Sequence, residues 1–502
     1  MHIPRSALKS NLGHKATFGN SGYFGLTSGY VEGMNNHPAY NPDRLFPADP
    51  GTRDIARRLY GYVADLPIVS PHGHLDPQMF VDNTPFPNPT KLLISPDHYL
   101  TRLLHSAGID MEELQVGGHE GQGPRHAWRL FCENWDLFAG TATGYWVEQE
   151  FAHVFGIDPS RICAEQADTL YDALSDVLAQ PDFRPRELAE KFKLDVLATT
   201  DDPLDDLAAH AALHADASFA PRVLPTFRPD AYTKMYNEGF AENVDKLIET
   251  AGDGKTGYEG YLQAMRNRRQ YFIDHGAVST DHGIHNCQTT PLEPAEAQAL
   301  LDMGLRGEAT FAEALVFEAN MTYRFAEMSQ DDGLVMTIHP GVYRNSSPTA
   351  LKKFGPDTGH DIPFGLDYIN GLQPLLADFG ENPDFHFVMF TMDETVFSRE
   401  IAPIAGYYPA AYAGAPWWFI DEIDAMKRFR AATTGTTGFS RYSGFIDDTR
   451  AYCSIPARHD TSRRVEASYL ARLVAEHRLT EDRAADIIVD LIDNSPRRVF
   501  NL

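Results

Sequence analysis

A pair of histidines early in the chain has the clearest chemistry. His72 and His74 flank Gly73 and follow a short apolar run at residues 66–69. Side chains of a strand alternate between its two faces, so both imidazoles would point the same way. Two imidazoles on one face at the end of a strand can hold one divalent metal ion. Because the chain has 20 His, this spacing also arises by chance, and its meaning depends on the elements around it.

Eight short runs have the character of buried parallel strands. They are mostly continuous and apolar, as strands covered on both faces should be. Helical patterns separate most of them, for example at residues 293–305 and 368–379. The runs are residues 68–72, 194–200, 222–227, 277–281, 334–339, 385–391, 410–413 and 444–447. Eight strands joined by helices predict an α/β protein built as a (β/α)8 TIM-type barrel.

An open, doubly wound sheet is the rival architecture. It would predict a glycine-rich phosphate loop directly after an early strand. The glycine-rich residues 118–123 follow a helical stretch instead, so we interpret them as an ordinary loop. This difference favours the barrel.

The chain divides into an extension and one large domain. Residues 1–45 are rich in Gly, Ser, Asn and Tyr without periodicity, which predicts an irregular N-terminal extension. Residues 46–502 would form the barrel, with a mainly helical insertion at about residues 80–190, after the first strand. Apolar stripes at residues 465–474 and 484–492 predict helices at the C-terminus, and Thr480 can cap the second of them.

Polar and charged side chains gather where the predicted strands end, which is where barrels carry their chemistry. Each one alone could be a helix cap or a core group, but the same concentration at successive strand ends indicates a site. Two His, an Asp and several Arg would suit a metal ion and an anionic substrate. The candidates are His72, His74, Arg228, Asp281, His339, Trp417, Trp418, Asp448 and Arg450.

Composition limits the partners. The net charge is −27, with 70 acidic against 43 basic residues, which argues against nucleic acid and anionic membranes. No run of 18 apolar residues predicts a transmembrane helix, and the N-terminus lacks the apolar core of a signal peptide. The four cysteines show no Cys-x-x-Cys spacing, so we expect reduced thiols in a cytoplasmic protein. We also expect the protein to form a homo-oligomer.

Several stretches, from about residue 45 to the C-terminus, match one known family in order and spacing. They are His72-Gly73-His74-Leu75, Asp97-His98-Tyr99, residues 146–157, Thr200-Asp201-Asp202-Pro203, Leu224-Pro225-Thr226-Phe227-Arg228, Asp281-His282-Gly283, His339 with Gly341 and Arg344, Trp417-Trp418-Phe419, Asp448-Thr449-Arg450 and Arg458-His459-Asp460 with Arg463-Arg464. The chain resembles the uronate isomerase (glucuronate isomerase) family of the amidohydrolase superfamily. It departs from the family pattern at Ser70, where Asp is usual, and at Thr449, where Ser is common.

The resemblance implies one divalent metal ion held by His72, His74 and Asp448. Imidazole and carboxylate ligands suit Zn²⁺, which we expect, although Mn²⁺, Fe²⁺ and Co²⁺ are compatible. Arg450 follows Asp448 by two residues, so in an extended segment both side chains would face the same side. Asp448 would then reach the metal while Arg450 reaches the substrate.

The implied reaction is an aldose–ketose isomerisation of a small anionic sugar. D-Glucuronate, D-galacturonate or both would be converted to D-fructuronate or D-tagaturonate by proton transfer between C1 and C2 through an enediol. Such a reaction needs a base, a proton donor and a clamp for the far end of the substrate.

Side-chain chemistry suggests who fills these roles. Arg228 and Arg450 are the natural clamps, because a guanidinium matches a carboxylate and stays charged. The candidate acids and bases are Asp448, His98, Tyr99 and His339, with Arg450 among the catalytic residues and His339 also in contact with substrate. Trp417 or Trp418 would wall the site.

Two other function classes stay open. A metal-dependent hydrolase of the same superfamily, acting on an amide, lactone or ester, often has a Lys on its fourth strand. The candidate strand at residues 277–281 has none. A carbohydrate-binding protein without catalysis would not need the cluster of His, Asp and Arg. The isomerase therefore fits best.

Overall fold

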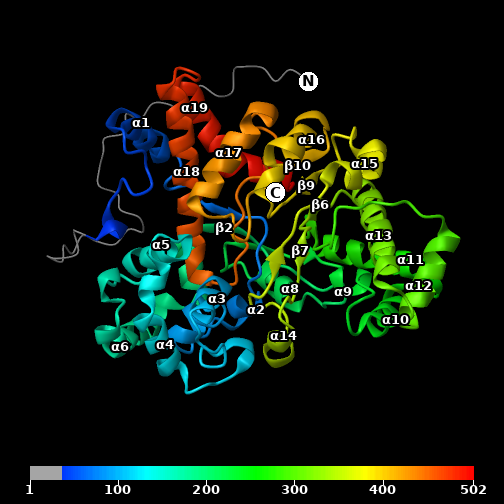
Figure 1. The fold of residues 1–502 in the computed structure, drawn as a ribbon, viewed down its shortest axis with the longest axis horizontal. Helices are drawn as coiled ribbons and strands as arrows, with labels where there is room; N and C mark the ends of the chain where they lie inside the picture. The colour runs from blue at the N-terminus through cyan, green and yellow to red at the C-terminus, as the bar shows by residue number, and fades with distance from the viewer. Residues whose placement is uncertain (1–36) are drawn as a thin grey trace.

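The computed structural model describes residues 37–502 as parallel strands surrounded by helices (Figure 1). Of the predicted extension, residues 1–36 lie outside the described residues. Residues 37–45 lie against the helical region that follows the first strand. Nε2 of His153 donates to the carbonyl of Ala39 at 3.0 Å, and Arg44 pairs with Glu148. The described end of the extension therefore packs on the rest of the chain.

Eight strands form two parallel sheets, in the orders β1-β2-β3 and β10-β9-β6-β5-β4. They are β1 (Ile68–Ser70), β2 (Leu194–Ala198), β3 (Arg222–Leu224), β4 (Thr226–Phe227), β5 (Ser279–His282), β6 (Val335–Ile338), β9 (Phe387–Met389) and β10 (Ala411–Ala413). Most of their residues are buried, as in strands covered on both faces. The predicted α/β class with parallel strands is confirmed.

The predicted strand at residues 222–227 is divided in two. Pro225 stands between β3 and β4, and proline has no N–H to donate to a neighbouring strand. β3 therefore pairs with β2, whereas β4 pairs with β5. An isolated parallel bridge between Asp201 and Phe227 joins the two sheets.

The predicted strand at residues 444–447 is wrong. The structure has only an isolated bridge in this region, between Ala413 and Tyr442. Gly444 has φ +85° and lies against Pro496, where an added Cβ would be 2.7 Å from the ring. That backbone conformation interrupts an extended run. A short antiparallel hairpin of β7 (Val342–Tyr343) and β8 (Ile362–Pro363) was not predicted.

Between β1 and β2 the chain is helical, and no strand is assigned to this described stretch. Its α-helices are α2 (Gln78–Asp82), α3 (His98–Ser106), α4 (Pro124–Glu133), α5 (Ala142–Gln149), α6 (Ala167–Leu178) and α7 (Pro185–Lys191). They share a hydrophobic cluster of their own in which Trp128 and Phe151 are fully buried. In Figure 1 these helices lie to one side of the strands.

The larger hydrophobic cluster lies between the strands and the helices that follow them. Met336, Phe387 and Val388 of the central strands are fully buried there. The covering α-helices are α9 (Asp230–Thr233), α10 (Phe240–Ala251), α11 (Gly257–Asp274), α12 (Pro294–Leu305), α13 (Phe311–Asp332), α15 (Tyr368–Phe379), α16 (Ala402–Tyr407) and α17 (Ile423–Thr437), whereas α8 (Ala208–Ala215) and α14 (Pro348–Phe354) pack on the other cluster. The helices predicted at residues 293–305 and 368–379 are thus confirmed.

The C-terminal helices close the fold against α1 (Pro50–Gly61). They are α18 (Ile455–Ala475), α19 (Glu481–Val489) and α20 (Ser495–Val499). Thr480 caps α19 as predicted, since its side chain accepts from the N–H of Arg483 at 3.3 Å. α18 is buried almost all round, and the buried pair of Arg430 and Glu466 joins it to α17.

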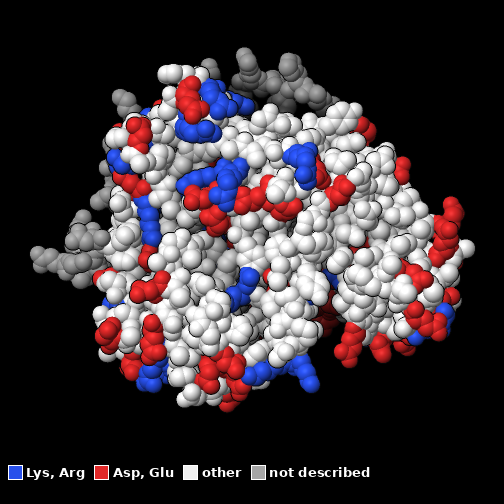
Figure 2. Space-filling model, in the orientation of Figure 1, with Lys and Arg blue, Asp and Glu red and all other residues white. Residues whose placement is uncertain are grey.

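Surface charge follows the composition. Figure 2 shows acidic side chains gathered along the edge where α10, α11 and α12 lie, with basic side chains scattered among acids elsewhere on this face. All four cysteines are free. No helix in residues 37–502 is long and apolar enough to cross a membrane.

Candidate active site

A small cavity lies where the parallel strands end, and every site residue predicted from the sequence lines it. Its volume is 60 Å³. The lining comprises His72, His74, Asp97, His98, Tyr99, Arg228, Asp281, His339, Arg344, Asp357, Trp417, Trp418, Asp448, Arg450 and Arg458, with a few neighbours. Residues from the helical region, such as those of α3, thus share one cavity with residues of the strand ends.

His72 and His74 face one oxygen of Asp448. Nε2 of His72 is 3.2 Å from Oδ1 of Asp448, and Nε2 of His74 is 2.9 Å from the same atom. One donor atom from each of the three residues lies within 4.8 Å of the others. Two imidazoles and a carboxylate match the preferences of a divalent ion such as Zn²⁺. The cluster can therefore bind a metal.

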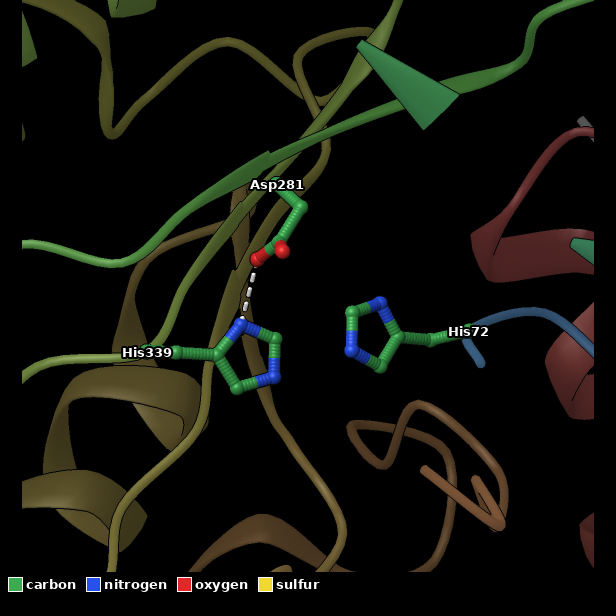
Figure 3. Close-up of side chains that lie close together, drawn as sticks. All are labelled: His72, Asp281 and His339. Atoms are coloured by element: carbon green, nitrogen blue, oxygen red, sulfur yellow. Dashed lines mark hydrogen bonds and ion pairs between the residues drawn. The ribbon is translucent and has the colours of Figure 1, made fainter. Parts of the chain in front are cut away.

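His339 forms a second cluster with His72 and Asp281, shown in Figure 3. Nδ1 of His339 lies 2.6 Å from Oδ1 of Asp281, and the rings of His339 and His72 stack with centroids 4.6 Å apart. A carboxylate bonded to Nδ1 fixes the proton there, which leaves Nε2 with its lone pair. Nε2 is buried and has no hydrogen-bond partner within the protein. That nitrogen is available to a substrate hydroxyl or a cation.

Arg228 is held by two carboxylates. Its Nη1 lies 3.2 Å from Oδ2 of Asp281, and its Nε lies 3.3 Å from Oδ2 of Asp230. Burial alone would lower the pKa of Arg228, but the two carboxylates outweigh it and hold that pKa above its ordinary value. Gly283 makes room for this arrangement, because a Cβ there would be 2.6 Å from Asp230. The guanidinium therefore stays charged at a fixed place in the cavity wall.

Arg450 pairs with a loop residue. Its Nη2 lies 3.1 Å from Oδ2 of Asp357. The expected extended geometry between Asp448 and Arg450 is wrong, because Asp448 has φ +44° in the left-handed region. Both side chains nevertheless line the cavity. The backbone turn at Asp448, and not the alternation of side chains along a strand, directs them there.

His98 and Tyr99 enter the cavity from the start of α3. Burial and the nearby Arg450 lower the pKa of His98 to about 3, so its imidazole is neutral at pH 7. The phenol of Tyr99 donates to Oδ1 of Asp421 at 2.7 Å and accepts from the N–H of Phe419 at 3.1 Å. The Tyr99 proton is therefore held by Asp421, and burial together with that carboxylate raises the pKa of Tyr99 well above its usual value.

The two tryptophans form one wall. Trp417 meets the ring of His339 edge-on with centroids 4.6 Å apart, and Trp418 lies 5.8 Å from the ring of His98. Trp418 and Phe419 have φ angles of +25° and +69°, which side chains other than glycine rarely adopt. Backbone strain of this kind persists only where the surrounding packing compensates for its energetic cost, and it is typical of functional sites.

Comparison with known proteins decides the family. A sequence model described as glucuronate isomerase matches residues 51–500. The chain belongs to the glucuronate isomerase family. The uronate isomerase of Corynebacterium efficiens is 74% identical over 469 residues, which cover 93% of this chain and 100% of that protein.

Two solved structures agree with this assignment. The crystal structure of glucuronate isomerase from Caulobacter crescentus matches with a TM-score of 0.90 at 44% identity, over 92% of this chain and 97% of that one. Uronate isomerase from Thermotoga maritima matches with a TM-score of 0.86 at 27% identity, over 92% and 99%. The predicted class of activity, isomerisation of an aldose uronate to a ketose, is confirmed by membership of this glucuronate isomerase family.

Sequence reasoning missed two carboxylates of this glucuronate isomerase site. Asp421 holds both Tyr99 and Arg458, with Oδ2 of Asp421 2.9 Å from Nη1 of Arg458. Its only signal in the sequence is its place shortly after Trp417 and Trp418. Asp357 has no signal at all, because it follows no strand and no recognisable motif. Its position depends on how the loop after α14 folds back.

A pair of buried carboxyl groups lies behind α3. Asp97 caps this helix by accepting from the N–H of Tyr99 at 2.8 Å. Burial, and then the charge of Asp97, raise the pKa of Glu150 from 4.5 to about 8. Burial also raises the pKa of Asp97 itself. Glu150 is therefore largely protonated at pH 7 in the folded protein.

We predict that Glu150 makes the fold less stable as pH rises. The folded protein holds the proton more tightly than the unfolded chain, so stability is full below about pH 4.5 and falls until about pH 8. The full loss for this rise in pKa from 4.5 to about 8 is on the order of 5 kcal/mol. Glu150→Gln removes this titration, so its melting temperature relative to that of the wild type should rise between pH 5 and pH 8. A difference that stays constant across this range would contradict the buried, protonated carboxyl.

Proposed function

We propose that the protein interconverts D-glucuronate or D-galacturonate with D-fructuronate or D-tagaturonate by proton transfer between C1 and C2. The observation that carries this proposal is the placement of Arg228 and Arg450 in one cavity with the cluster of His72, His74 and Asp448. Two guanidinium groups suit the carboxylate of a sugar acid, and the cluster suits a metal at the reacting end. Family membership supports the same reaction.

One divalent metal ion would be held by His72, His74 and Asp448. Their donor atoms already converge, and the unpartnered Nε2 of His339 lies in the neighbouring cluster around His72. Zn²⁺ fits the imidazole and carboxylate donors, and Mn²⁺, Fe²⁺ and Co²⁺ are compatible. When bound, such an ion would supply Lewis-acid polarisation of a sugar oxygen.

The arginines bind and orient the substrate. Arg228 is fixed by Asp281 and Asp230, so it presents its guanidinium at a constant position. Arg450, two residues after Asp448, supplies a second guanidinium to the same cavity. Trp417 and Trp418 exclude water along one wall, which strengthens charge interactions within the cavity.

One carboxylate can carry the proton. Asp448 takes it from C2 and returns it to C1, because both carbons present the same face of a planar enediol to a base beside them. The hydroxyl proton on O2 passes to O1 in the same conversion, so that the C1 aldehyde becomes an alcohol and the C2 alcohol becomes a ketone. Arg450 stabilises the negative charge that develops on the oxygens. The neutral imidazole of His98 and Nε2 of His339 can hold substrate hydroxyls. Tyr99 acts by positioning the Phe419 backbone beside the tryptophans.

We also propose that the strands close into a (β/α)8 barrel that extends over residues 46–502, with residues of about 80–190 inserted after β1. The support for this closure comes from contacts at the two edge strands β10 and β1. The N–H of Ser443 donates to the carbonyl of Ala413 at 3.0 Å, next to β10. The N–H of His74 donates to the carbonyl of Thr449 at 3.2 Å. Residues 441–449 thus contact both the last strand and the end of the first. The cytoplasmic location and the homo-oligomer stay predictions.

The direct test of the function is to incubate the purified protein with D-glucuronate and with D-galacturonate. We expect a ketouronate product from at least one of them, detected by NMR, with exchange of the C2 proton for solvent deuterium or its transfer to C1. A lactone panel serves as the control for hydrolase chemistry. Hydrolysis of a lactone with no ketouronate formed would overturn the proposal.

We predict that replacing one of the three proposed ligands weakens metal binding. In equilibrium dialysis against Zn²⁺, the wild type should bind one ion per chain, and His74→Ala should weaken binding by about 100-fold or more. His477→Ala removes a histidine beyond the end of α18 and is the matched control. Equal zinc binding by His74→Ala and the wild type, measured by mass spectrometry of the metal, would rule this cluster out.

We predict that Arg450→Lys lowers turnover on the order of 100-fold or more, because lysine keeps the charge but loses the planar fork. Metal content and melting temperature should change little. Arg428→Lys is the matched control, since Arg428 also pairs with a carboxylate, that of Glu394, but lies on the surface. If Arg450→Lys kept near wild-type turnover, the substrate clamp would be Arg228 alone.

A further inference from the structure

A carboxylate of the chain itself stands among the arginines of the cavity. Oδ2 of Asp357 lies 3.1 Å from Nη2 of Arg450. Burial would raise the pKa of Asp357, but Arg450, Arg344 and Arg228 outweigh it and hold that pKa far below its usual value. All four residues line the same cavity. Asp357 is therefore a carboxylate of the protein itself, placed where the three arginines would attract the carboxylate of a substrate.

The cavity that Asp357 helps to line is small for a sugar acid. Its volume is 60 Å³, whereas pockets for small molecules usually measure about 300–1,000 Å³. A chamber of 660 Å³ lies beside it, lined in part by Lys234, Tyr236 and His285. Asp357 and Arg450 belong to the lining of both. Asp357 thus stands on the boundary between the open chamber and the inner cavity.

The backbone around Asp357 is built from unusual conformations. Gly355 has φ +84° and Gly359 has φ +90°, and Asp357 between them has φ +57°. An aspartate in the left-handed region costs about 1 kcal/mol relative to an ordinary conformation. A Cβ on Gly359 would be 2.4 Å from Cγ of Arg102, so the segment is pressed closely against α3. Two glycines can accommodate a change of direction that other residues would resist.

The chain is anchored on both sides of this segment. Before it, Nζ of Lys353 in α14 lies 2.9 Å from Glu112 and 3.2 Å from Asp110. After it, Asp361 accepts from the N–H of Asn345 at 2.6 Å and pairs with Arg344 at 3.1 Å. The flanking residues are therefore held in place, and a rearrangement would be confined to residues 355–359, where Pro356 and Asp357 are exposed.

We propose that the carboxylate of Asp357 occupies the subsite of the substrate carboxylate, and that a sugar acid binds by displacing it as residues 355–359 swing toward the chamber. This inference rests on the proposed function, since it takes Arg450 as a substrate clamp. In each state Arg450 is paired with a carboxylate. The side chains of Arg450 and Asp357 are 36% and 48% exposed, so their ion pair is weak and the carboxylate of a substrate can replace it.

The exchange also explains how the site would select its substrate. A neutral aldose has no carboxylate to replace that of Asp357, so it would leave Arg450 without its ion pair. A uronate replaces one ion pair with another. Asp357 is then a residue that determines specificity, although it takes no part in the proton transfer.

The test is the affinity for D-glucarate, a six-carbon dicarboxylate that has no aldehyde and cannot isomerise. Fluorescence of Trp417 and Trp418 or calorimetry reports its binding. Asp357→Asn removes the competing charge but keeps the side-chain shape. We expect its Kd to be about tenfold lower than that of the wild type, as follows if the open state is roughly one tenth populated. Asp384→Asn removes the same charge from an exposed turn before β9 and should leave Kd unchanged.

Hydrogen exchange gives a second measurement. Amides of residues 355–359 should exchange faster in the wild type when D-glucarate is bound, because the displaced segment loses its contacts with Arg450 and α3. Slower exchange with ligand, or a higher Kd in Asp357→Asn, would show that Asp357 binds the substrate and would overturn the displacement. Equal Kd values for the wild type and Asp357→Asn would overturn it too.

Failure of this inference is distinguishable from failure of the proposed function. Turnover of D-glucuronate and D-galacturonate is measured on the same wild-type preparation. Absence of turnover refutes the function, while the D-glucarate affinities still decide the displacement. Turnover without any binding of D-glucarate by either protein refutes the displacement alone.

Discussion

One buried carboxylate, Asp281 at the end of β5, joins the two halves of the site. It bonds to Nδ1 of His339 at 2.6 Å and pairs with Arg228 at 3.2 Å. Burial would raise the pKa of Asp281, but Arg228 and the two histidines hold it well below its usual value. Because an unpaired charge in this position would be costly, Asp281 fixes the tautomer of His339 and the direction of Arg228 together.

The same rule governs the rest of the cavity. Arg458 is paired with Asp421, which in turn holds the phenol of Tyr99. Arg450 is paired with Asp357. Each cation is thus positioned by an anion from a different segment of the chain, so the site is a network of matched charges. Arg450 differs from Arg228 because its partner lies in a glycine-flanked loop and not in a helix or at a strand end.

The architecture explains why these charges can meet. Parallel strands bring their carboxyl ends to one edge, so residues that follow β1, β4, β5 and β6 converge there. The helical region between β1 and β2 adds α3, which brings His98 and Tyr99 to the same cavity. The loop between β7 and β8 adds Asp357. Strand ends therefore supply the fixed part of the site, and the long connections supply the parts that enclose it.

Local patterns predicted much of this. Seven of the eight predicted apolar runs coincide with parallel strands, since burial on both faces leaves a clear signal. The helix at residues 368–379 and the cap at Thr480 were also found, because both depend on neighbouring residues. The exception at residues 444–447 failed because Gly444 follows a conformation imposed by contact with Pro496, which is distant in sequence.

The sequence by itself determined the parallel α/β class, the family resemblance and most of the residues that line the cavity, because these follow from periodicity, strand ends and motif spacing. Only the tertiary structure decided how those residues are paired. It placed the Tyr99 hydroxyl on Asp421, turned the backbone at Asp448 and set Asp357 beside Arg450. Such pairings join residues far apart in the chain, and their geometry depends on packing and charge in three dimensions, which no local pattern encodes.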